Sequence, residues 1–312
     1  MKHIVCSVVF MMALCCCPHL FGQWTAPQGD TLEPLLNAAA KQVSTLHAVY
    51  TYSDLGGPAR HNMVTNDFVG NRIDAIAMFP PEVSPSQPAV HRWITDGHNT
   101  WTGILRPAAP DVIPGSWQIQ RFGEGDQVPQ PDMSTHEFGH ELLKAAVVPY
   151  HILKRARLTS QPLPEGMSLK IDNWSKRDRT YRAYRILQNG LVVTEILYEM
   201  DISDGLRILS TTCSAQMGSK LVPIYVLNLD NFKKISDVWF PFKITETLYD
   251  TDLKPYHPNT ITVHSVDMNM VLTDAAFSFV PTNGSIVEDV RTEKVTIVDY
   301  RLPKQVLEKQ HR

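Results

Sequence analysis

The chain has 312 residues, 43% of them apolar, and a formal net charge of −3. It is long enough to bury a full hydrophobic core, and its slight acidity argues against nucleic acid as a partner. Four of the five cysteines lie within the first 17 residues and the fifth is Cys213, so the rest of the chain has neither an intramolecular disulfide nor a thiolate metal cluster.

The N-terminus, MKHIVCSVVFMMALCCCPHLFGQWTA, places Lys2 and His3 before an apolar run that extends to residue 17. This pattern is typical of a secretory signal, which we expect to cover residues 1–23. The run is too short for a membrane span, and no later stretch reaches ~18 apolar residues. Because export without disulfides suits a bacterial periplasm, we expect a periplasmic protein.

The first predicted element is a helix over residues 31–46, within DTLEPLLNAAAKQVSTL. Its leucines and Val43 recur every three or four residues and so form one apolar face. The period then changes, because HAVYTYSDL (47–55) alternates like a strand. Gly56 and Gly57, followed by Pro58, end it.

The stretches RIDAIAMF and HRWITDGHNTWTGI predict strands, with a hairpin turn at Asp96-Gly97. Residues 105–134 are rich in Pro, Gly, Asp and Gln and are predicted to be a loop. A helix is expected from Ser134 to Val148, because Ser134 and Glu137 have the spacing of a capping box.

After Pro164 the sequence predicts antiparallel strands. YRAYRILQNGLVVTEILYEM forms two of them around Asn189-Gly190, the strongest short hairpin signal in the chain. Four more strands follow, in LRILSTTCSA, VPIYVLNLD, VWFPFKITETLYD and TITVHSVDMNMVL. The pattern predicts an α+β domain with a large antiparallel sheet and an inserted helical pair.

The pentapeptide His136-Glu137-Phe138-Gly139-His140 matches the H-E-x-x-H signature of zinc peptidases. In that interpretation His136 and His140 bind the metal and Glu137 is the general base. A third ligand is missing, since leucine and alanine stand three and six residues after His140. On a continuous helix His151 would lie ~16 Å along the axis from it.

Two other features admit two interpretations each. The run SKRDRTYRAYR (175–185) is either a surface for an anionic lipid or acidic partner, or a solvated strand face. Cys213, in STTCSA, is more typical of a small buried residue than of a nucleophile.

Four stretches, in this order along the chain, resemble the LolA family of periplasmic lipoprotein carriers. They are VSTLHAVYTYSDLGG (43–57), WITDGHNTW (93–101), VVPYHILKRAR (147–157) and LTDAAFSFVPTNGSIVEDVRT (272–292). The resemblance implies an unclosed antiparallel β half-barrel with helices covering the concave face. The helices would be the segments 31–46 and 134–157.

The resemblance also implies an apolar cavity closed by a lid. In the family an arginine near the start of the third strand holds the lid shut, and Arg72 lies in the comparable region. The expected ligand-binding residues of cavity and lid are Tyr50, Arg72, Trp93, Trp101, Tyr150, Ile152, Leu153 and Phe240.

We therefore expect a non-enzymatic periplasmic carrier, without a cofactor, that shields the acyl chain of a lipoprotein or lipid on its way to the outer membrane. Its expected partners are that acyl chain, an inner-membrane release complex and an outer-membrane acceptor, and the carrier itself is expected to be a monomer. The expected domains are the signal, the half-barrel over 24–292 and a charged extension over 293–312. The alternatives are a zinc metallopeptidase, or a LolA-like lipid-binding or sensor domain without a carrier role.

Overall fold

The computed structural model describes residues 32–53, 57–79, 90–107, 109–123, 165–250, 252–256 and 258–299. The chain divides into two compact units whose segments interleave in sequence. The first unit comprises residues 1–42 and 142–260, and the second comprises 43–141 and 261–312. Each unit is built mainly of β-strands.

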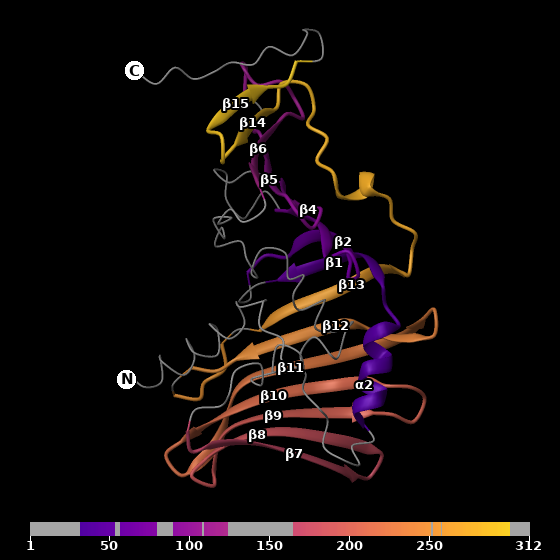
Figure 1. The fold of residues 1–312 in the computed structure, drawn as a ribbon, viewed down its shortest axis with the longest axis vertical. Helices are drawn as coiled ribbons and strands as arrows, with labels where there is room; N and C mark the ends of the chain where they lie inside the picture. The colour runs from indigo at the N-terminus through magenta and orange to yellow at the C-terminus, as the bar shows by residue number, and fades with distance from the viewer. Residues whose placement is uncertain are drawn as a thin grey trace. The chain divides into compact units, whose positions relative to one another are not determined.

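The first unit contains helix α2 (Leu32–Lys41) and a sheet of long antiparallel strands (Figure 1). In sheet order the strands are β12, β11, β10, β9, β8 and β7. This order is linear, so the sheet stays open. The strand bounds are β7 Met167–Lys176, β8 Arg179–Gln188, β9 Leu191–Asp201, β10 Arg207–Met217, β11 Lys220–Ile235 and β12 Val238–Leu248.

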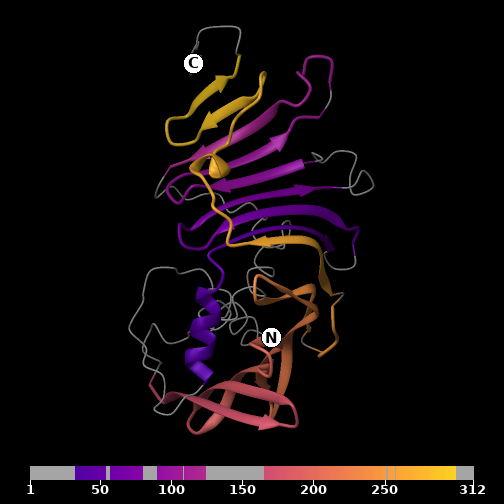
Figure 2. The ribbon, with the colours of Figure 1, turned by 90° about the vertical axis from the view of Figure 1, so that its right-hand side faces the viewer.

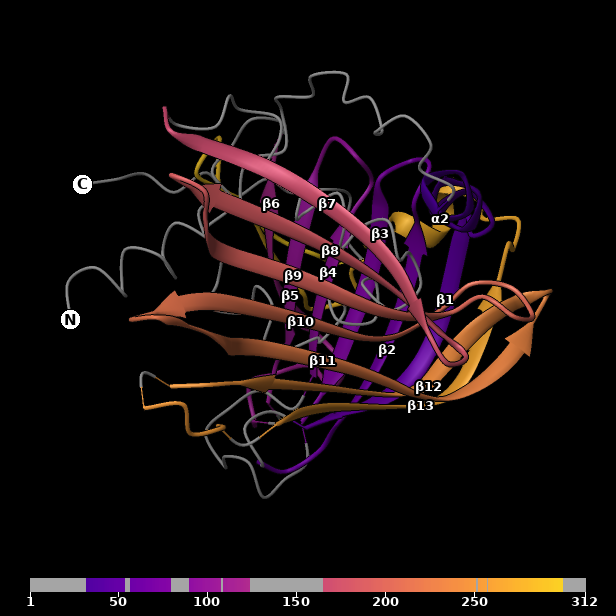
Figure 3. The same ribbon diagram turned by 90° about the horizontal axis from the view of Figure 1, so that it is seen from below.

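Local sequence accounts for the β8–β9 hairpin. Gln188 pairs with Leu191 across the turn, and Asn189 and Gly190 both have positive φ, at 52° and 82°. Asparagine and glycine tolerate that conformation, and such a turn matches the twist of the two strands. This twist continues through the strands from β7 to β12 (Figure 3). The hairpin predicted at this turn is confirmed.

The second unit holds nine strands in the order β15, β14, β6, β5, β4, β3, β2, β1 and β13. The neighbouring strands from β1 to β6 pair antiparallel, as do β14 and β15, whereas β14 pairs parallel with β6. The bounds are β1 Thr45–Ser53, β2 Arg60–Asp67, β3 Arg72–Met78, β4 Val90–Thr95, β5 Thr100–Leu105, β6 Trp117–Phe122, β13 Asn259–Met268, β14 Ile286–Asp289 and β15 Lys294–Ile297.

A connecting segment between β13 and β14 crosses one face of this second sheet, and we call residues 270–285 the strap. It contains the 3-10 turn η1 (Asp274–Phe277) and runs across the purple strands in Figure 2. Phe277 is fully buried. Phe279 packs edge-on against Trp117, with ring centroids 5.5 Å apart. A Cβ at Gly103 would come within 2.6 Å of the Phe279 ring, so glycine in β5 permits this close packing.

The helix predicted over residues 31–46 is observed, but α2 ends at Lys41. Val43 and Leu46 are buried outside it, and Leu46 lies in β1, where it pairs with Asn66. The spacing of Val43 and Leu46 suits a helical face, but Leu46 pairs with a residue of β2 and therefore belongs to a strand. The prediction of a loop throughout 105–134 is wrong at Trp117–Phe122, which form β6 between β5 and β14.

The described chain is mostly β, with α2 and η1 as its helical elements. The expected open, largely antiparallel sheet is observed, but helices covering a concave face, as the α+β prediction required, are not supported. The described helix is too short for that role, and the segment 134–157 lies outside the described residues. The signal over 1–23 lies outside them as well. None of the helices in the described ranges has the length and apolar character of a membrane span.

Candidate functional site

The first unit presents a broad apolar sheet face. Strand pairing aligns Asn173, Arg182, Tyr198, Thr211 and Leu227 in one row across β7 to β11. Residues directly opposite each other in antiparallel strands share a face, so we name this surface the Arg182 face. Its buried apolar side chains are Ile186, Ile196, Tyr198, Met200, Leu227, Leu229, Phe240, Phe242 and Ile244.

Arg182 places a positive charge inside this apolar face. The side chain is 0% exposed. Its Nε donates to the Tyr184 hydroxyl at 2.5 Å, and one terminal nitrogen donates to the Asn173 side chain at 3.5 Å. The guanidinium also lies 4.9 Å from the centre of the Tyr184 ring. Burying a charge is costly, so polar groups gather around it.

Two hydroxyl groups beside Arg182 are buried without a hydrogen-bond partner. Tyr198 and Thr211 face each other on β9 and β10, each is 1% exposed, and both oxygens are unsatisfied. An unsatisfied buried hydroxyl costs about 1–3 kcal/mol of folding free energy. A hydrogen-bonding ligand that reaches both oxygens would remove this cost.

The side chains around Tyr198 form a compact cluster. Burial raises the pKa of the Tyr198 hydroxyl well above its usual range, Cys213, Tyr184 and Tyr225 raise it further, and Arg182 lowers it. The Tyr184 and Tyr198 rings meet edge-on, with centroids 5.9 Å apart. Because the pKa stays high, Tyr198 keeps its proton at neutral pH and can donate a hydrogen bond.

The opposite face of the same strands carries conventional ion pairs. Arg185 lies 2.5 Å from both Asp172 and Glu195. Arg182 and Arg185 both belong to the charged run 175–185 but lie on opposite faces of β8. The interpretation of this run as a solvated strand face suits Arg185, whereas Arg182 belongs to the interior.

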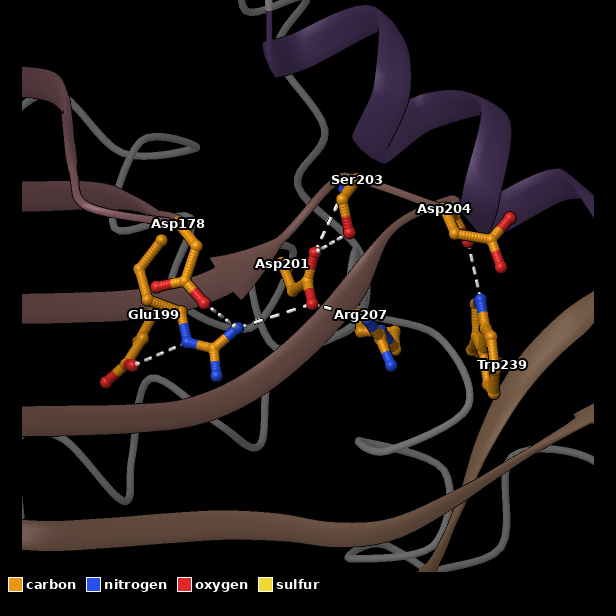
Figure 4. A network of polar contacts seen from close by, with 8 residues as sticks. Asp178, Glu199, Asp201, Ser203, Asp204, Arg207 and Trp239 are labelled. Carbon is orange, nitrogen blue, oxygen red and sulfur yellow. Dashed lines mark hydrogen bonds and ion pairs between the residues drawn. The ribbon is translucent and has the colours of Figure 1, made fainter.

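A polar network lies where β9 turns into β10 (Figure 4). Arg179 and Asp201 are the strand neighbours of Thr180 and Met200, so they lie on the side opposite the Arg182 face. Asp201 accepts hydrogen bonds from the Ser203 hydroxyl at 2.6 Å and the Ser203 amide at 2.9 Å. It also pairs with Arg207, and with Arg179 at 3.3 Å. The Ser203 hydrogen bonds lower the pKa of Asp201, burial opposes them, and the two arginines lower it further.

The same turn is attached to the β11–β12 hairpin through Trp239. The indole nitrogen of Trp239 donates to the Asp204 carbonyl at 2.5 Å, as Figure 4 shows. The Arg207 guanidinium lies 4.7 Å from the centre of the Trp239 ring. These contacts fix the turn and do not form a reaction site.

The predicted cavity residues fall in both units. Tyr50 in β1 is fully buried, and burial raises its pKa above the usual range against the effect of a hydrogen bond with Asn62. Trp93 in β4 and Trp101 in β5 are half-buried. Trp93 pairs with Ala75 and Trp101 with Ile94, so the two tryptophans lie on opposite faces. Phe240 lies on the Arg182 face of the first unit.

Arg72 connects β3 to the strap through contacts with Asp274 and Phe277. It pairs with Asp67 at 2.6 Å and with Asp274 at 2.6 Å, and its guanidinium lies 4.6 Å from the centre of the Phe277 ring. Burial raises the pKa of Asp67, but hydrogen bonds from Gly70 and Arg72 outweigh this effect and lower it. The contact with the lid that the resemblance implied for Arg72 stays a prediction.

The remaining predicted residues lie outside the described ranges. They are Tyr150, Ile152 and Leu153 of the lid, and His136, Glu137 and His140 of the zinc motif. Within the described ranges, no three His, Cys, Asp or Glu residues are grouped as a metal site would require.

Sequence reasoning missed Tyr198 and Thr211, and it treated Arg182 only as part of a charged run. Arg182 is in phase with Tyr184 and Ile186 along β8, and this alternation was the available signal.

No family model matches the chain, and a search of curated proteins gives no match. Two solved structures are similar to it. One is a LolA superfamily protein from Nitrosomonas europaea, with 10% sequence identity and a TM-score of 0.41, covering 80% of this chain and 98% of that one. The other is a DUF1329 family protein from Desulfovibrio piger ATCC 29098, with 10% identity, a TM-score of 0.39 and the same coverage of both chains.

Proposed function

We propose that the chain binds the acyl chain of a lipid or lipoprotein against the Arg182 face and carries it through the periplasm without covalent chemistry. The observation that supports this proposal is the apolar character of the Arg182 face, which extends over β8 to β12 of an open sheet. An apolar sheet face needs a second layer to shield it from water. Within the described part of the first unit, α2 is the one helix, and it buries Leu32 and Leu36.

Apolar burial supplies enough free energy for this role. Each buried methylene contributes about 0.8 kcal/mol, so fifteen of them contribute about 12 kcal/mol. Association costs at least 4 kcal/mol in lost freedom. The remaining free energy corresponds to a dissociation constant near the micromolar range, which suits a carrier that must release its cargo.

The lid remains part of the proposal. Tyr150, Ile152 and Leu153 would cover the acyl chain and separate from the sheet to load and release it, as a two-state opening. Tyr50 and Trp93 lie on one face of the second unit and Trp101 lies on the other, and all three stay predicted cavity residues. The release complex and the acceptor remain predicted partners.

A bulky residue on the Arg182 face tests the proposal. Cys213 is half-buried on this face, opposite Ile196, and Thr212 next to it points to the other face. We expect Cys213→Trp to weaken binding of a fluorescent fatty acid at least tenfold, because the indole occupies the space of the acyl chain. The matched variant Thr212→Trp should bind like the wild type.

Displacement titrations on the chain from residue 24 onward measure the affinity for the fatty acid, and thermal melts check that each variant is folded. Native mass spectrometry identifies any lipid that copurifies. The proposal is wrong if the wild type binds no acyl ligand, or if both tryptophan variants bind as it does.

A further inference from the structure

We infer that strand β7 is a docking edge for a second copy of this chain. The two copies pair antiparallel through β7 about a twofold axis, so that the sheets of their first units become one. A dimer of this kind does not depend on acyl binding, and it differs from the monomer expected from the sequence.

β7 forms a long and regular edge of the sheet. It ends the strand order, and among the described strands it pairs with β8 alone. It has ten residues, contains no proline and follows β8 without a register shift. Proline, bulges and short length are devices that keep an edge strand from pairing with another chain. None of the ten residues is buried, whereas the neighbouring strand β8 has four buried residues. The edge is therefore accessible and lacks these devices.

The charges of β7 are self-complementary about Ile171. Residues directly opposite each other in antiparallel strands share a face, so a twofold pair must be centred on one residue. With Ile171 at the centre, Lys170 lies opposite Asp172 of the partner subunit, and this pair occurs twice. Their side chains are 58% and 28% exposed. Just beyond the strand, Glu165 and Arg177 are exposed at equal distances along the chain from Ile171, so they also meet as opposite charges.

Other centres near the middle of β7 fit less well. A pair centred on Lys170 or on Asp172 sets that charged residue opposite itself. A pair centred on Asn173 sets Lys170 opposite Lys176 of the partner subunit, and one centred on Leu169 forms no ion pair. Opposite charges across two strands are stabilising and like charges are destabilising. Charge complementarity therefore favours a second copy of the chain in the register centred on Ile171.

The same register covers apolar side chains on both faces of β7. Leu169 and Ile171 are half-buried and lie on the Arg182 face, where Ile171 packs against its own copy on the axis. On the other face, Trp174 is 38% exposed and stacks on Tyr181 with ring centroids 5.4 Å apart. Lys170 of the partner subunit becomes a diagonal neighbour of Trp174, and an ammonium group over an indole ring is stabilising.

A cysteine on the twofold axis tests the register. Cys213 is the one cysteine beyond residue 17, so Cys213→Ala provides a background without thiols for the chain from residue 24 onward. Opposite residues of antiparallel strands have Cα atoms about 4.5–5.5 Å apart, which a disulfide can bridge. We expect mild oxidation to link most Ile171→Cys chains into covalent dimers.

The matched control is Leu169→Cys, on the same face of the same strand. In the proposed register it lies about 13 Å along the strand from its own copy, so it should stay unlinked. A mixture of Leu169→Cys and Asn173→Cys chains should form a linked heterodimer, because these two residues lie opposite each other.

A charge reversal tests the ion pairs without any cysteine. Sedimentation equilibrium over a series of protein concentrations should show a monomer–dimer equilibrium for the wild type. Lys170→Glu sets two carboxylates opposite each other, so we expect the dissociation constant of the dimer to rise at least tenfold. The matched control is Lys220→Glu, which makes the same change of charge at an exposed position at the start of β11. It should dimerise within twofold of the wild type, and thermal melts check that each variant is folded.

Two outcomes would overturn the docking edge. A wild type that stays monomeric at every concentration, with Ile171→Cys and Leu169→Cys linking equally slowly, takes no second copy at β7. A dimer that Ile171→Cys does not trap and Lys170→Glu does not weaken forms through another surface. Acyl binding stands in both cases, because displacement titrations measure it separately.

Discussion

The charge on Asp201 is stabilised by short hydrogen bonds and two arginines, and the side chain is 10% exposed. Because its pKa is lowered in the folded state, the carboxyl takes up a proton at higher pH in the unfolded chain, near pH 4. Its contribution to stability is therefore fully present above about pH 4 and is lost as pH falls through the folded pKa. Asp67, held by Arg72 and two loop amides, acts in the same direction.

We predict that Asp201→Asn lowers the free energy of unfolding at pH 7 by about 2 kcal/mol, because the amide keeps some hydrogen bonds but loses both ion pairs. The difference from the wild type should shrink as pH falls below the lowered folded-state pKa of Asp201, because the wild-type carboxyl is then protonated. Urea unfolding at a series of pH values measures this. The matched control is Asp178→Asn, whose side chain is 79% exposed beside Arg179 and should change stability by less than about 0.5 kcal/mol. A constant difference at every pH would contradict the prediction.

At the scale of elements, the strap and β5 depend on each other. The strap attaches through Arg72 to Asp274, and through Phe279, whose ring fills the space above Gly103. Arg92 adds to this contact, with its guanidinium 5.2 Å from the centre of the Phe279 ring. The sheet face beneath the strap is thereby shielded by a segment with little regular structure.

We predict that Gly103→Ala destabilises the chain by about 2 kcal/mol, because its Cβ would overlap the Phe279 ring. In a Phe279→Ala background the same change should be neutral or slightly stabilising, since alanine loses less conformational entropy than glycine on folding. Chemical denaturation of the four chains of this double-mutant cycle measures the coupling free energy. Equal costs of Gly103→Ala in both backgrounds would place the strap elsewhere.

At the scale of the whole molecule, a ligand that binds only the folded state stabilises it by mass action. Palmitate at 100 times its dissociation constant should raise the free energy of unfolding by about 2.7 kcal/mol. Hydrogen exchange shows where this stabilisation acts. We predict that protection increases in peptides from β8 to β10, which carry the Arg182 face. An increase confined to β1 to β4 would instead place the acyl chain on the face of the second unit that carries Tyr50.

Much of the architecture follows from local sequence. The Asn189-Gly190 turn fixes one hairpin, because few other residue pairs adopt two positive φ angles at low cost. The loop 96–99, with positive φ at Gly97, closes the hairpin of β4 and β5. Alternating apolar residues then predict most strands of both units, and these predictions are confirmed. Trp117–Phe122 was missed because the Pro- and Gly-rich residues before it suggest a loop, while pairing with β5 and β14 makes it a strand.

The candidate site depended on a detail that no local pattern reveals. If the pairing continued residue by residue along β8 and β9 from the Asn189-Gly190 turn, Arg182 would pair with Leu197. A bulge between Ile186 and Leu187 shifts the register by one residue, so Arg182 pairs with Tyr198. A shift of one residue moves every side chain to the other face. The sequence by itself determined that these strands form a hairpin, and only the tertiary structure decided that Arg182 points into an apolar interior, because the bulge is selected by packing across the whole sheet.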